Sequence, residues 1–404
     1  MPYGNFYYGK DGFLYKKQGA IGARRNFPLG LICNQPADLN VKYTPGSGVS
    51  GAVSSTNYAI RRKMIRNSAR CYENNCGINY FFLGYPLGYI PPTPVPPFYG
   101  NLLSTITTTP NPNGYDTWFG NALSWSSDGK LAIGAPYYDD PQTTDNDTGR
   151  VYVYANATTS SPVLLSTITT TPNPNGYNTL FGYALSWSSD GKLAIGAPYY
   201  DDPQTTNNNT GRVYVYANAN TGSPVLLSTI TTTPNPNGYS TLFGQALSWS
   251  SDGKLAIGAP NYDDPQTTNN NTGRVYVYAN ANTGSPVLLS TITTTANING
   301  FNTWFCNALS WSSDGKLAIG APSYDDPQTT NNNTGRVYVY ANANTGSPVL
   351  LSTITTTPNP NNNYDTLFGQ ALSWSSDGKL AIGAPLYNDP QTSNNNTGRV
   401  YVYN

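Results

Sequence analysis

The sequence of 404 residues predicts an all-β fold: a five-bladed β-propeller preceded by a basic, mostly extended arm with one short helix. The first observation behind this prediction is an internal repeat, FGxALSWSSDGKLAIGAP, whose copies start at Phe119, Phe181, Phe243, Phe305 and Phe368. The second is that every copy carries four short β-rich runs. The third is an offset between the two ends of the array. Internal repeats of this length are typical of propellers and solenoids.

Four strands are expected in each copy, and in the first copy they fall at about 122–126, 130–135, 150–155 and 163–169. Each run is bounded by turn residues, such as SSDG and TPNPNG, and the run at 150–155 alternates valine with tyrosine. Four antiparallel strands in a unit of about 60 residues describe a propeller blade. A solenoid of stacked hairpins is the alternative, but it needs polar caps that the last unit lacks.

The ends of the array predict how the ring closes. The array begins with an LLSTIT run at Leu102 and ends at Asn404, directly after RVYVY. We expect Leu102–Thr107 to be the outer strand of the last blade, paired with Arg399–Tyr403, because closure covers an exposed sheet edge. The alternative is that this strand is donated to a neighbouring subunit, which propagates into a filament when the contact does not close.

The unit resembles the FG-GAP repeat of integrin α-subunit propellers and related surface proteins. The resemblance is carried by Phe-Gly at 119–120, Asp-Gly at 128–129, Gly-Ala-Pro at 134–136 and Gly-Arg-Val-Tyr at 149–152. It covers about three quarters of the chain. The fourth copy departs from the pattern because Cys306 replaces the glycine, which we interpret as drift within a redundant array.

This resemblance implies a calcium site in the loop between the first two strands, where the sequence reads SWSSDG. Calcium takes about six to eight oxygen ligands, several of them anionic. One carboxylate and a few hydroxyls are a poor set, so the sequence favours a hairpin turn and no cofactor, with Ca²⁺ as the disfavoured alternative. The candidate ligands are Asp128, Asp190, Asp252, Asp314 and Asp377.

A ligand-binding face is the second candidate site. By strand order, the PNPNGY and YDDPQTT loops emerge on one face of the propeller, and the resemblance implies that this face contacts ligands. Aromatic and polar groups together suit a glycan or a protein receptor, whereas solvated tyrosine-rich loops are the alternative. The candidates are Tyr115, Tyr137, Tyr138, Asp139, Asp140, Tyr177, Tyr199, Tyr200, Asp201, Tyr239, Tyr262 and Asp263.

Composition excludes several classes of enzyme. The chain has no histidine, which removes Ser-His-Asp and Cys-His pairs, and its one glutamate, Glu73, leaves no paired-glutamate chemistry. Nearly identical copies also present equivalent faces, whereas catalysis needs unlike groups that converge. We therefore expect no enzymatic activity and no catalytic residues.

Charge separates the chain into a basic N-terminal docking arm (1–85), a Pro-rich linker (86–100) and the propeller (101–404). Residues 1–100 hold 11 basic and 3 acidic residues, 11 − 3 = +8, and the rest of the chain balances this at −8. The segment Ser54–Arg70 predicts a helix. Its basic ridge consists of Arg61, Arg62, Arg66 and Arg70.

The arm indicates the partners and the location. A basic helix fits an acidic protein surface or nucleic acid, so we expect capsid or filament proteins as partners and nucleic acid for the arm only. The stretches GAIGARRNFPLG and YTPGSGVSGAVSSTNYAIRRKMIRNSAR are similar to N-terminal segments of virion proteins of large DNA viruses of algae and protists. No signal peptide or transmembrane segment is evident. These features predict a structural or display protein of a virion or extracellular surface assembly; the alternatives are a secreted or cell-surface adhesin and a filament built by strand donation.

Overall fold

The computed structural model describes residues 6–8, 14–16, 102–108, 116–140, 147–170, 178–202, 209–232, 240–264, 271–294, 303–326, 333–355, 365–388 and 396–404. The chain divides into two compact units, Met1–Asn101 and Leu102–Asn404. In the first unit, β1 (Phe6–Tyr8) and β2 (Leu14–Lys16) pair as an antiparallel hairpin. The predicted helix at Ser54–Arg70, its basic ridge and the linker at 86–100 lie outside the described residues.

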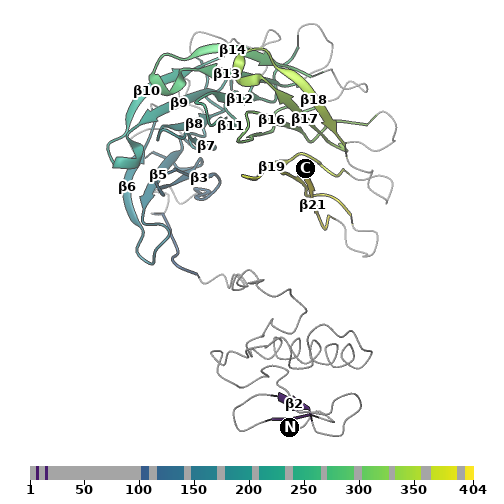
Figure 1. Ribbon diagram of the computed structural model, residues 1–404. Helices are drawn as coiled ribbons and strands as arrows, with labels where there is room; N and C mark the ends of the chain where they lie inside the picture. The colour runs from purple at the N-terminus through teal and green to yellow at the C-terminus, as the bar shows by residue number, and fades with distance from the viewer. Residues whose placement is uncertain are drawn as a thin grey trace. The chain divides into compact units, whose positions relative to one another are not determined.

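The second unit consists of five antiparallel sheets, one for each copy of the repeat (Figure 1). The innermost strands are β3 (Leu123–Trp125), β7 (Ala184–Trp187), β11 (Ala246–Trp249), β15 (Ala308–Trp311) and β19 (Ala371–Trp374). The second strands are β4 (Leu131–Ala135), β8 (Leu193–Ala197), β12 (Leu255–Ala259), β16 (Leu317–Ala321) and β20 (Leu380–Ala384). The third strands are β5 (Arg150–Ala155), β9 (Arg212–Ala217), β13 (Arg274–Ala279), β17 (Arg336–Ala341) and β21 (Arg399–Tyr403). The outermost strands are β6 (Val163–Ile168), β10 (Val225–Ile230), β14 (Val287–Ile292) and β18 (Val349–Ile354).

The sheets are arranged as the blades of a propeller. Their innermost strands lie side by side in chain order, and β6, β10, β14 and β18 lie at the periphery (Figure 1). Short 3₁₀ turns precede the outer strands of the second, third and fourth blades: η2 (Ala219–Thr221), η3 (Ala281–Thr283) and η4 (Ala343–Thr345). The predicted all-β, five-bladed propeller is confirmed. Within the described ranges, no helix has the length and apolarity needed to cross a membrane.

Each blade packs against the next through side chains that alternate along its third strand. In β5, Val151 and Val153 are fully buried and belong to one cluster with Phe181 of the second blade. Tyr152 and Tyr154 face the other way and pack within the cluster of the first blade. A period of two places successive side chains on opposite faces, so a sheet between two neighbours is apolar on both. The core of this propeller therefore lies between its blades.

Two glycine positions set the distance between neighbouring blades. An ideal Cβ on Gly134 of β4 would lie 2.1 Å from the carbonyl oxygen of Gly182 in the second blade. Gly182 has a φ of +91°, a conformation that residues with a side chain rarely adopt, and its N–H donates to the Gly196 carbonyl at 3.0 Å. The Phe-Gly and Gly-Ala-Pro motifs therefore mark the place where two backbones touch.

The fourth copy shows what happens when one of these glycines is replaced. Cys306 is fully buried at a φ of 73°, and its sulfur lies 3.1 Å from the Arg274 carbonyl oxygen. An ideal Cβ on Gly258 would lie 2.7 Å from the Cys306 carbonyl, so this junction is wider than the one at Gly134. A side chain at positive φ costs about 1–3 kcal/mol unless its surroundings hold it. The array tolerates the cysteine by opening one junction slightly.

The fifth blade differs from the prediction because it has three strands. Its order is β19-β20-β21, so among the described strands β21 has a neighbour on one side only. The prediction that Leu102–Thr107 closes the ring against Arg399–Tyr403 is wrong: residues 102–108 form no strand, and Leu102 is 82% exposed. Ile106 still packs against the first blade, as the matching isoleucine of each later copy packs against the blade that follows it. The segment therefore lies where an outer strand would lie, and what is missing is its pairing with β21, which belongs to the blade at the other end of the arc.

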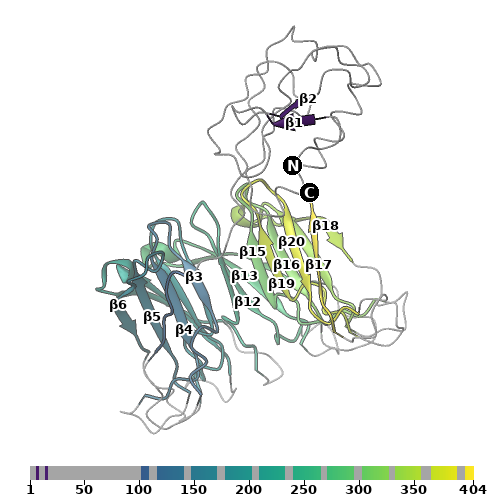
Figure 2. The ribbon, with the colours of Figure 1, turned by 90° about the horizontal axis from the view of Figure 1, so that it is seen from below.

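The first and last blades each have one uncovered face. Trp125 in β3 is 50% exposed, whereas its counterpart Trp187 in β7 is 8% exposed. Val400 in β21 is 67% exposed, whereas its counterpart Val151 in β5 is fully buried. Figures 1 and 2 show the result: the blades form an open arc with β3 at one end and β19 at the other.

The glycine contact predicts a large difference between two matched substitutions. Gly196→Ala places a methyl group where an ideal Cβ lies 2.0 Å from the Gly244 carbonyl, whereas at Gly383 the nearest atom is 3.4 Å away. We expect Gly196→Ala to lower the free energy of unfolding by about 2 kcal/mol or more, and Gly383→Ala by less than about 1 kcal/mol. Urea denaturation of dilute protein measures both. Equal costs would show that a backbone also lies against the fifth blade.

Candidate functional site

The five SSDG turns, which contain the candidate calcium ligands, join the first two strands of each blade. In the first copy, the Ser126 hydroxyl donates to Asp128 Oδ1 at 2.5 Å and accepts the backbone N–H of Lys130 at 2.8 Å. The Lys130 ammonium lies 3.4 Å from Asp128 Oδ2. The same serine–aspartate bond recurs in every copy, so the aspartates close hairpin turns, as the sequence favours: Asp128, Asp190, Asp252, Asp314 and Asp377.

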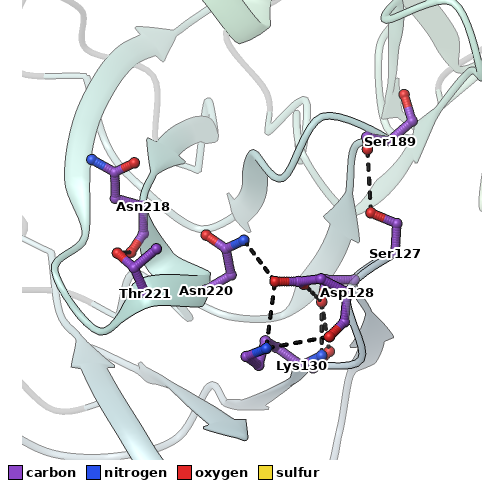
Figure 3. A network of polar contacts seen from close by, with 8 residues as sticks. Ser127, Asp128, Lys130, Ser189, Asn218, Asn220 and Thr221 are labelled. Atoms are coloured by element: carbon purple, nitrogen blue, oxygen red, sulfur yellow. Dashed lines mark hydrogen bonds and ion pairs between the residues drawn. The ribbon is translucent and has the colours of Figure 1, made fainter.

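The turn aspartates also join neighbouring blades. Asn220, from η2 of the second blade, donates to Asp128 Oδ2 at 3.0 Å, and the Ser127 hydroxyl donates to the Ser189 carbonyl at 3.2 Å (Figure 3). The Asn–Asp bond recurs at the next two junctions. The Ser126 hydrogen bond, helped by Asn220 and Lys130 against the effect of desolvation, holds the pKa of Asp128 below its ordinary value. This carboxylate is therefore charged at neutral pH and serves the turn and the junction.

The donor set for a metal ion is small at these turns. Over the described ranges, no group of three or more His, Cys, Asp and Glu side chains could hold a metal ion. Both carboxylate oxygens of Asp128 already accept hydrogen bonds within the protein. Calcium needs several carboxylate or carbonyl oxygens at one point. That the turns work without a cofactor stays a prediction.

The long loop between the second and third strands of each blade is organised by a buried carboxylate. Asp139 is 1% exposed, and its Oδ1 accepts the backbone N–H of Asp147 at 2.7 Å. Thr148 donates its hydroxyl to the Tyr138 carbonyl at 3.0 Å, and the Arg150 guanidinium lies 3.8 Å from the centre of the Tyr138 ring. A charged acceptor for a backbone N–H holds a loop firmly.

Several residues of the predicted ligand face are therefore interior residues. Six of the candidates are at most 5% exposed: Tyr138, Asp139, Tyr200, Asp201, Tyr262 and Asp263. Their side chains hold the loops in place from the interior. Each aspartate accepts a backbone N–H of its loop, and each tyrosine ring lies against an arginine guanidinium. Asp140, Tyr137 and Tyr199 are partly exposed. Tyr115, Tyr177 and Tyr239 lie outside the described residues.

The described ends of the two loops lie together. The Thr179 hydroxyl, which follows the PNPNGY loop, donates to the Thr148 carbonyl at the end of the YDDPQTT loop, at 2.5 Å. A parallel bridge also joins Gly149 to Phe181. These contacts cross from one blade to the next, so the loop face is continuous between blades.

An aromatic cluster occupies this face at the first two blades, and it consists of Trp118, Tyr137, Tyr183 and Tyr199. The ring of Trp118, which is 52% exposed, lies 4.3 Å from that of Tyr137. Desolvation, with the neighbouring Tyr199 and Asp147, raises the pKa of Tyr137. Desolvation, followed by Tyr199 and Tyr137, raises the pKa of Tyr183. The ring contact between Trp118 and Tyr137 is the geometric centre of this cluster.

Sequence reasoning identified Tyr137 and Tyr199 but missed Trp118 and Tyr183. A sequence signal for this cluster exists at the positions where the first two copies differ from the others. The positions matching Tyr183 in the other copies are asparagine or glutamine, and those matching Tyr137 include asparagine, serine and leucine. The cluster thus belongs to two blades rather than to all five. Exposed rings with hydroxyl groups can stack on a sugar or on an apolar peptide side chain.

The cations of the propeller are all engaged in local contacts. Its ten lysines and arginines occupy two positions of each copy. Each lysine pairs with the aspartate of its own turn, and each arginine lies over a tyrosine ring at 3.7–3.9 Å. Exposed ion pairs of this kind contribute little to stability. The lysine charges of the propeller are therefore paired with carboxylates, whereas its arginines lie against tyrosine rings.

Comparison with known proteins gives no family. No family model matches the chain, and no curated protein matches it. Among solved structures, the periplasmic gluconolactonase PpgL of Pseudomonas aeruginosa aligns with 17% identity and a TM-score of 0.43. The alignment covers 65% of this chain and 64% of that one, so it spans less than two thirds of either protein. The propeller assignment rests on the strand order, and membership of the FG-GAP family stays a prediction.

The turn contacts predict that calcium removal leaves the propeller intact. Because Asp128 is held by Ser126, Asn220 and Lys130, millimolar EDTA should shift the thermal midpoint by less than about one degree. Differential scanning calorimetry with and without EDTA measures the shift, and added CaCl₂ is the control. A fall of many degrees that CaCl₂ reverses would restore the calcium interpretation.

Proposed function

We propose that this chain is a non-enzymatic structural and surface-display protein of a virion, docked through its basic arm and presenting the propeller outward. The observation that supports this most is that the polar groups repeated in every copy make structural contacts. The aspartates of the SSDG turns, the buried aspartates of the long loops and the lysines and arginines hold turns, loops and junctions together. In an enzyme, unlike groups converge on one reacting atom.

The docking role is assigned to the arm by charge. Residues 1–100 carry a net charge of +8, whereas the propeller carries −8 and pairs each of its lysines with an aspartate. An anionic surface would therefore attract the arm and repel the propeller. The virion, as the site of docking, is supported by the similarity of the arm to virion proteins of large DNA viruses. Kinship of the repeats with FG-GAP propellers is part of this proposal.

An adhesin is the second candidate, and the aromatic cluster favours it. Trp118, Tyr137, Tyr183 and Tyr199 offer rings and hydroxyls on one face, which suits a glycan or a protein receptor. Display and adhesion are compatible on one protein. The location of the protein distinguishes the two functions, because a secreted adhesin occurs free in the medium and a virion component sediments with particles.

Arm substitutions test the docking role. We expect Arg62→Ala, Arg66→Ala and Arg70→Ala together to reduce the amount of protein in purified particles at least tenfold, because the ridge supplies the charged contact. Quantitative immunoblotting of particles measures this. The control removes the same charge elsewhere in the arm, at Lys10, Lys16 and Lys17, and should keep most of the protein in particles. Unchanged incorporation of the ridge variant would contradict docking, and wild-type protein found only in the medium would favour the adhesin.

A further inference from the structure

The chain contains the same interface four times, once between each pair of neighbouring blades. One side supplies the two valines of its third strand and the isoleucine of its outer strand. The other supplies the phenylalanine of Phe-Gly with the leucine and isoleucine of LAIGA. The backbone N–H of the tryptophan in the following blade donates to the serine hydroxyl of the preceding one at 3.2–3.3 Å, as that of Trp187 does to Ser124. The structure thus defines a complementary pair of faces.

One half of this interface is uncovered at the start of the array. This head face consists of Leu123 and Trp125 in β3, with the segment 102–108 beside them. Leu123 is 60% exposed, whereas the matching Leu185 packs in the cluster of the next blade. Ile106 fills the place that the outer-strand isoleucine of a preceding blade takes in later copies. The head face is therefore a junction that lacks the first three strands of the preceding blade.

The other half is uncovered at the end of the array. This tail face consists of Val400 and Val402 in β21, with the unpaired edge of that strand. The matching valines of the first three blades are fully buried. Among the described residues, the fifth blade consists of the first three strands of the repeat. Each end of the array thus lacks what the other end holds.

The four internal junctions argue against closure within one chain. At three of them an ideal Cβ on the second-strand glycine would lie only 2.0–2.1 Å from the next carbonyl oxygen, so these backbones are in contact. Closing the arc of Figure 1 would require several junctions to change their angle together, and packed interfaces resist such deformation. A separate copy of the chain carries the matching face, so the contact can form between copies while each arc stays open.

We propose that the tail face of one copy binds the head face of a second copy. In this contact, residues 102–108 of the second copy add to β21 as its fourth strand, and Val400 and Val402 cover Leu123 and Trp125 of the second copy. The Ser373 hydroxyl accepts the Trp125 N–H, as Ser124 accepts that of Trp187. The contact is heterologous, so each copy keeps one free face until the assembly closes or grows. This inference holds whether the protein is a virion component or an adhesin.

Sedimentation velocity of the full chain over a range of about 0.5–50 µM tests the contact. Wild-type protein should form dimers or larger species whose proportion rises with concentration. A head variant, Leu123→Asp with Trp125→Asp, and a tail variant, Val400→Asp with Val402→Asp, should each weaken self-association at least 100-fold, because a carboxylate in an apolar interface stays desolvated. Both pairs are exposed in a single chain, and circular dichroism checks the fold; lysine at the same positions serves if an aspartate variant unfolds.

Mixing the two variants separates this proposal from its rivals. The head variant keeps its tail face and the tail variant keeps its head face, so a 1:1 mixture should form a dimer that neither forms alone. The matched control, Val225→Asp with Val287→Asp, changes two valines of outer strands that are each 51% exposed, and it should assemble as wild type does. Wild-type protein that is monomeric at every concentration, or a mixture without complex, would overturn the proposal, as would loss of assembly in the control.

Discussion

Neighbouring blades of this propeller touch through their backbones, at the glycine of one LAIGA strand and the carbonyl of the next Phe-Gly motif. An ideal Cβ at Gly134 would lie 2.1 Å from the Gly182 oxygen, which leaves no room for any side chain. The close approach brings Val151 and Val153 against Phe181 and excludes water from the space between the sheets. The core, the motifs and the spacing of the copies all depend on this contact. The contact tolerates a side chain at Cys306, because the two backbones at that junction lie slightly farther apart.

The strand pattern was predictable because it depends on local periodicity. Alternation of valine and tyrosine in β5, and the turn residues around it, determine a strand whatever lies beside it. Ring closure was not predictable, since a strand count is satisfied equally by pairing within a chain and between chains. What decides it is the angle between neighbouring blades, which leaves no trace in the repeat count.

The candidate sites also combine features that the local sequence determines with features that depend on contacts between distant residues. The SSDG turns were predictable because the serine, aspartate and glycine of each turn lie next to one another in the sequence, whereas the absence of calcium there stays a prediction. Asp139 and Tyr138 were expected at the surface of the loops, but a buried loop carboxylate has the same local sequence as an exposed one. Only the structure shows that Asp139 accepts a backbone N–H eight residues later in the chain. Trp118 and Tyr183 stand out only when the copies are compared with one another, at positions where the repeat varies.

The five blades form an open array whose two ends are complementary, and hydrogen exchange of the full chain tests this most directly. The peptides 399–404 and 102–108 should exchange faster in dilute protein than the matching strand β17, whose outer edge is paired with β18. As the concentration rises, both peptides should gain protection together, while β17 does not change. Protection of 399–404 equal to that of β17 in a dilute monomer would show that the chain closes on itself and would contradict the open array.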